Sequence, residues 1–63
     1  MDLKEKLVKE KEEIDLKIKS LQLFIETNEV FKSLIDAEKR DLAEQLNIMR
    51  HYSLILQSRI NRI

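Results

Sequence analysis

The sequence contains no glycine, proline, cysteine or tryptophan among its 63 residues. Without cysteine, neither disulfides nor a cysteine-ligated zinc ion can stabilise this short chain. A chain of about 60 residues buries only ~60% of the surface that it exposes when unfolded, so a single small core is marginally stable. We therefore expect the protein to gain stability by associating with copies of itself.

An excess of charge of one sign is also missing, because 12 basic residues are balanced by 12 acidic ones. This balance argues against a DNA-compacting or membrane-surface protein, which needs a clear basic excess. No apolar run approaches the ~20 residues of a membrane span, and the charged N-terminus has no signal-peptide core behind it. We expect a cytoplasmic protein that binds neither a DNA or RNA polymer nor a membrane.

Since glycine and proline are absent and good helix formers dominate, nothing in the sequence breaks a helix outright. Two segments show the helical spacing of three, four and seven between apolar residues. The first covers roughly residues 2–26 and has a gap in its apolar pattern at Glu10 and Lys11. The second runs from about residue 34 to the end, and its pattern is interrupted only by Ser53. Its stripe consists of Leu42, Leu46, Met49, Ser53, Leu56, Ile60 and Ile63.

The connection between these segments loses the helical period. Asn28 tolerates the left-handed conformation that often ends a helix. Ser33 and Asp36 have the spacing of a capping box, which predicts that Ser33 caps the second helix. A one-turn helix near residues 29–32 is compatible with the pattern. We expect two apolar side chains to plug the open end of a hairpin: Phe31 and Leu34.

The predicted fold is all-α, an antiparallel helical hairpin that forms a single domain over residues 1–63. Both helices carry more apolar surface than a two-helix hairpin can bury, and such patches mark association sites. We expect an obligate homo-oligomer in the form of a helical bundle. The expected oligomer interface contains Leu16, Leu23, Ile48, Tyr52, Leu54 and Ile55.

The sequence offers almost nothing for catalysis. Its one histidine, His51, has no second histidine at i±4, and there is no glycine-rich loop to hold a phosphate. Glu12 and Glu13 are adjacent, so on a helix their carboxylates point in different directions. We expect a protein that is not an enzyme and has no metal site or cofactor.

The distribution of charge is more informative than its total. No acidic residue follows Glu44, whereas Arg50, Arg59 and Arg62 lie in the last 19 residues. Arg59 and Arg62 are three apart and share a helix face. One interpretation is that they complement the helix dipole. The other is that a symmetric oligomer gathers such arginines around an axis, where they hold a polyanion.

Several motifs span nearly the whole chain. They are residues 9–21 running into Phe24-Ile25, then 31–34 and 45–52, followed by Leu56 and Arg59-Ile60. Together they are similar to very small phage proteins of the form K-x-L-x-x-F-I, F-x-x-L, Q-L-x-x-M-x-x-Y, L-x-x-R-I. This pattern resembles the phage anti-CBASS cyclic-oligonucleotide sponge family.

The resemblance implies a homohexamer that sequesters cyclic oligonucleotides without cleaving them and so blocks CBASS-type immune signalling. Family members have one pocket type for cyclic dinucleotides, which uses an N-terminal aromatic and a lysine, and another on a threefold axis for cyclic trinucleotides. No aromatic precedes Phe24 here, so the resemblance favours a cyclic trinucleotide over a cyclic dinucleotide. By this resemblance the ligand-binding residue of the dinucleotide pocket is Lys17 or Lys19. The trinucleotide pocket uses Arg59 or Arg62 together with a polar side chain of the first helix, near Ser20 or Gln22.

Two other functions compete with sequestration. A structural or adaptor oligomer would use its exposed apolar stripe to hold another protein and would have no nucleotide ligand. A small transcriptional regulator would need a basic recognition helix, which the mixed Lys/Glu faces do not supply.

Overall fold

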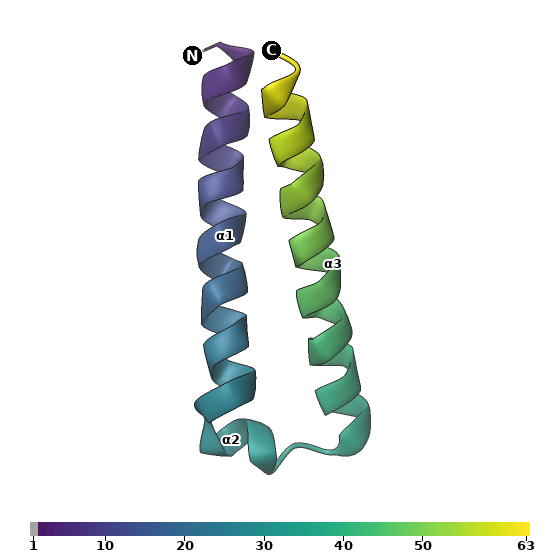
Figure 1. Cartoon of the computed structure of the whole chain (residues 1–63). Coiled ribbons are helices and arrows are strands. Elements are labelled where there is room, and N and C mark those ends of the chain that lie inside the picture. Colours follow the sequence, from purple (N-terminus) through teal and green to yellow (C-terminus); the bar gives the residue numbers. More distant parts are fainter. Residues whose placement is uncertain (1) are drawn as a thin grey trace.

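The computed structural model describes residues 2–63 as a hairpin of two long helices (Figure 1). In chain order the elements are α1 (Leu3–Thr27), α2 (Glu29–Lys32) and α3 (Asp36–Asn61). The helices α1 and α3 run antiparallel and side by side, with both chain termini at one end and α2 at the other. The molecule measures 44 × 15 × 14 Å. The predicted all-α hairpin and the one-turn helix in its connection are confirmed.

Side-chain caps fix where α1 begins and ends. Asp2 accepts a hydrogen bond from the Glu5 amide at 2.8 Å, which satisfies one of the free amides of the first turn. At the other end Asn28 is extended, with φ −88° and ψ 129°. Asn28 does not use the left-handed conformation that it tolerates, and no residue within 2–63 has positive φ. The reason is that Asn28 also caps α2, accepting from the Val30 amide at 2.8 Å, and an N-cap residue adopts extended geometry.

The start of α3 also differs from the prediction. The helix begins at Asp36, and Ile35 at its N-cap position makes no side-chain hydrogen bond. The Ser33 hydroxyl instead donates to the Val30 carbonyl at 2.8 Å, at the end of α2. The predicted capping box is therefore wrong, because its serine stabilises the preceding helix. Asp36 and Glu38 do lie in the first turn, where the helix dipole favours acidic residues.

Two phenylalanines pack together near the connection, where the long helices are farther apart (Figure 1). The ring centroids of Phe24 and Phe31 are 6.0 Å apart at 79°, an edge-to-face contact. The Lys39 ammonium lies 5.8 Å from the Phe31 centroid, which adds a cation–π contact. Phe31 thus joins α1, α2 and α3, as expected of a plug at the open end.

The core lies along the seam between α1 and α3. Leu56 is completely buried, and Leu7 and Leu46 are nearly so. Ser53, in the same stripe of α3, is also buried. Each fully buried leucine contributes roughly 1.5–3 kcal/mol. The stripe predicted for the second helix is confirmed from Leu42 to Ile60, and within residues 2–63 it supplies only a small buried core. Its last predicted member, Ile63, follows α3 and is 57% exposed.

Candidate functional site

Two of the predicted ligand-binding residues share a surface hollow of about 450 Å³ between α1 and α3, which we call the Lys17 hollow. Lys17 and Ser20 come from α1, and Gln45 and Met49 come from α3. Small-molecule sites of roughly 300–1,000 Å³ combine an apolar lining with a few polar groups, and this hollow has that composition. Sequence reasoning missed Gln45, because only the antiparallel pairing brings it opposite Ser20. The rest of the lining is apolar, from Leu16 and Leu21.

Lys19 lies in a different hollow, of about 470 Å³, although it is only two residues from Lys17. Glu12 and Asp15 line this second hollow together with Leu16. No carboxylate within residues 2–63 lines the Lys17 hollow, whereas two line the hollow of Lys19 and oppose the entry of an anion there. Of the two predicted lysines, Lys17 is therefore in the better environment for a phosphate.

Gln22 is occupied by contacts within the chain. Its side-chain carbonyl accepts from Arg50 Nη2 at 2.9 Å, and its amide donates to Glu26 Oε1 at 3.1 Å. The first of these bonds joins α1 to α3. The structure thus pairs Gln22 with Arg50, whereas the resemblance placed it with an arginine nearer the C-terminus.

Arg59 and Arg62 lie near the C-terminal end of α3, and both are exposed. Arg62 donates from Nη1 to the Ser58 hydroxyl at 3.0 Å. Because Ser53 contacts Asp15, Arg59 lies near the level of Lys9 on α1. At ~1.5 Å per residue, Ser20 is then on the order of 16 Å further along the hairpin. A single chain does not bring these arginines together with Ser20 and Gln22, so a pocket that contains both sets needs a second chain.

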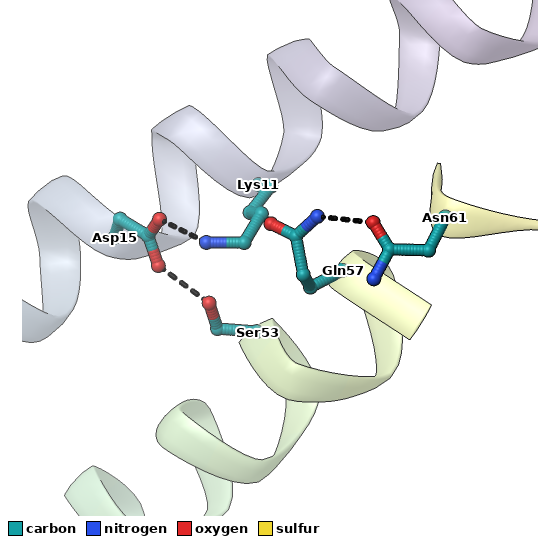
Figure 2. Close-up of polar contacts among 5 residues, drawn as sticks. All are labelled: Lys11, Asp15, Ser53, Gln57 and Asn61. Carbon is teal, nitrogen blue, oxygen red and sulfur yellow. Dashed lines mark hydrogen bonds and ion pairs between the residues drawn. The ribbon is translucent and has the colours of Figure 1, made fainter. Parts of the chain in front are cut away.

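A polar bridge crosses the seam where the apolar pattern of each helix is interrupted (Figure 2). The Asp15 carboxylate accepts from the Lys11 ammonium at 2.7 Å and from the Ser53 hydroxyl at 2.5 Å. The hydrogen bonds from Lys11 and Ser53 hold the pKa of Asp15 below its usual value. Further along α3, the Gln57 amide donates to Asn61 at 2.8 Å. The bridge explains why the gap at Lys11 does not break the hairpin.

The six residues expected at an oligomer interface are all exposed in the single chain, by 39–68%. At ~100° per residue they lie on three separate faces. Leu16 and Leu23 lie on the side of α1 that is opposite the core. Leu54 lies on one flank of α3, and the other three residues lie on another flank. Those three share one stripe of α3: Ile48, Tyr52 and Ile55.

Comparison with known proteins identifies the family. A family model described as Sequestin matches residues 1–62. The chain belongs to the Sequestin family. No curated protein and no solved structure matches the chain. The match agrees with the resemblance to the phage anti-CBASS sponges, which was based on motifs over nearly the same residues.

The family name describes a protein that sequesters a ligand, and hence one that binds rather than converts it. Two further observations concern residues 2–63 of the chain. No group of three or more His, Cys, Asp or Glu side chains there is arranged to hold a metal ion. No helix in that range has both the length and the apolar composition needed to cross a bilayer.

Proposed function

We propose that this protein binds cyclic oligonucleotide second messengers in the host bacterial cytoplasm and holds them intact, which blocks CBASS-type immune signalling. Membership of the Sequestin family over residues 1–62 is the observation that carries this proposal. Cyclic trinucleotides are the preferred ligands and cyclic dinucleotides the weaker ones. The active form is a homohexamer with a threefold axis.

The charges of α3 support an anionic ligand. The ion pairs within residues 2–63 are Lys11–Asp15 and Lys32–Glu29, so neither Arg59 nor Arg62 is neutralised within the chain. Arginine donates to phosphate in a bidentate manner, and a charge-assisted hydrogen bond contributes ~1.5–3 kcal/mol. Three copies of such an arginine around an axis match the three phosphates of a cyclic trinucleotide.

The preference for cyclic trinucleotides over cyclic dinucleotides follows from the lack of an aromatic residue in the Lys17 hollow. Lys17 supplies an ammonium for a phosphate, and Ser20 and Gln45 supply hydrogen bonds. No aromatic residue lines the hollow, and stacking of a base on an aromatic side chain is worth ~1–3 kcal/mol. A dinucleotide bound there therefore lacks a main source of affinity.

Thermal unfolding with and without a panel of cyclic di- and trinucleotides tests the proposal. We expect a cyclic trinucleotide to raise the melting temperature and to be recovered chemically intact after denaturation. Arg59→Ala or Arg62→Ala should abolish the rise, because each removes a phosphate contact at every copy around the axis. Arg40→Ala is the matched control, since Arg40 is an exposed arginine near the opposite end of α3. An unchanged melting temperature across the whole panel would eliminate the proposal.

The exposed leucines of α1 favour one alternative, a helical oligomer that acts as an adaptor for another protein. Leu16 is 67% exposed and Leu23 is 50% exposed. An adaptor would show no response to nucleotides and would lose its protein partner on Leu16→Glu or Leu23→Glu. The nucleotide panel and these two variants distinguish the two functions.

A further inference from the structure

A second stripe runs along α3, separate from the one that packs on α1. Its members are spaced by three or four residues and fall within a band about 80° wide at ~100° per residue. Its centre lies about 120° around the helix from the buried stripe of Leu46, Ser53 and Leu56. All of its residues are exposed, so nothing within residues 2–63 covers it. This second stripe consists of Asp41, Glu44, Ile48, Tyr52, Ile55, Arg59 and Arg62.

The second stripe has a symmetric order of charges. Its two acidic residues come first, its three apolar residues lie in the middle and its two arginines come last. Asp41 and Arg62 lie at equal distances from the point midway between residues 51 and 52, and so do Glu44 and Arg59. Ile48 and Ile55 are related in the same way, which leaves Tyr52 beside the centre. Reversing the helix direction therefore exchanges acidic with basic positions and leaves apolar positions apolar.

We infer that the second stripe is the interface on which another copy of this chain docks, with its α3 antiparallel to the first. A twofold axis perpendicular to α3 brings the same patch of both copies together in antiparallel order. Each residue then meets the partner position that lies equally far on the other side of the centre. Antiparallel docking places Arg59 and Arg62 beside the partner's Glu44 and the partner's Asp41. Parallel docking would place arginines beside arginines and acids beside acids, and like-charge contacts of this kind oppose association.

This interface is compatible with a nucleotide ligand. A guanidinium has five N–H donors, so Arg59 can pair with a carboxylate and still donate to a phosphate. The inference itself does not depend on the ligand, because it rests on the charge order and exposure of α3. It can therefore fail while sequestration holds, and the reverse is also true.

Cysteine crosslinking tests both contact and direction, since the chain has no cysteine of its own. Residues 44 and 59 of one chain are roughly 22 Å apart along the helix, so they cannot form an intrachain disulfide. We expect a mixture of Glu44→Cys and Arg59→Cys chains to give a mixed covalent dimer as the main oxidised product. Homodimers of Glu44→Cys would show parallel docking, and the absence of any crosslink would show that the stripe is not an interface. Either result overturns the inference.

Charge exchange provides a second test without oxidation. We expect Arg59→Glu to weaken association about tenfold, because two attractive pairs per dimer become repulsive. Adding Glu44→Arg should restore association to near its original strength, since the partner's charges are then complementary again. Lys9→Glu on α1 is the control and should leave association unchanged. If the double variant associates no better than Arg59→Glu alone, the antiparallel arrangement is wrong.

Discussion

Replacing Ser53 with alanine tests the polar bridge between the long helices. The substitution removes the hydroxyl that donates to Asp15 at 2.5 Å and leaves the Lys11–Asp15 pair in place. A hydrogen bond to a charged group contributes ~1.5–3 kcal/mol when it is shielded from water. The Asp15 side chain is 44% exposed, so water replaces part of the lost bond. We expect Ser53→Ala to lower the free energy of unfolding by about 1 kcal/mol near pH 7.

The effect of this substitution should depend on pH, with a sign fixed by Asp15. Its pKa is lowered in the folded protein, first by the hydrogen bond from Lys11 and then by the one from Ser53. The resulting stability is fully present above the unfolded pKa of about 3.9, and it is lost as the pH falls through the lower folded pKa. The difference between the original protein and Ser53→Ala should therefore shrink below about pH 4.

Urea unfolding followed by circular dichroism, at one fixed protein concentration, measures both quantities. Asp15→Asn and the double variant complete a double-mutant cycle, which isolates the coupling between the two side chains. We expect a coupling energy of at least about 0.5 kcal/mol near pH 7. If Ser53→Ala is as stable as the original protein at every pH and the cycle shows no coupling, the bridge does not stabilise the hairpin.

Two further substitutions test the core and the start of α3. Leu56→Ala should destabilise the protein by about 2–5 kcal/mol, because Leu56 is completely buried in a small core. A loss of stability below about 1 kcal/mol in urea unfolding would contradict the packing described. Ile35→Asp should raise the melting temperature, because it supplies the missing N-cap acceptor. Such caps contribute ~0.5–2 kcal/mol, and the isoleucine side chain that is replaced is 74% exposed. A melting temperature that falls or does not change would show that the Ile35 side chain stabilises the protein by other contacts, which the added cap does not replace.

The sequence predicted the hairpin because the apolar period of three and four is a property of each helix by itself. Local competition for backbone groups is harder to predict, and the wrong prediction of the Ser33 capping box arose from it. Ser33 had two helix ends within reach and stabilises the earlier one. Asn28 tolerates the left-handed conformation that often ends a helix, but it is extended and its side chain caps α2. Sequence spacing alone does not indicate which of two neighbouring helix ends a short polar side chain serves.

Contacts between the helices are even harder to predict from the sequence than the local contacts at helix ends. The gap at Lys11 and the serine within the α3 stripe were visible as separate irregularities. Only the register of α1 against α3 shows that Asp15 joins them. The same register brings Gln45 to the Lys17 hollow and Arg50 to Gln22. A shift of one helix turn would change every one of these pairs, and the sequence contains no local feature that fixes the register.

Native mass spectrometry of the purified protein mixed with a cyclic trinucleotide tests sequestration most directly. It reports in one spectrum how many chains assemble and whether an intact ligand stays bound to them. We expect a multi-chain assembly that retains uncleaved ligand, and no retained ligand for Arg59→Ala. A folded single chain that carries no ligand, or an assembly that releases a linearised nucleotide, would contradict the proposed function.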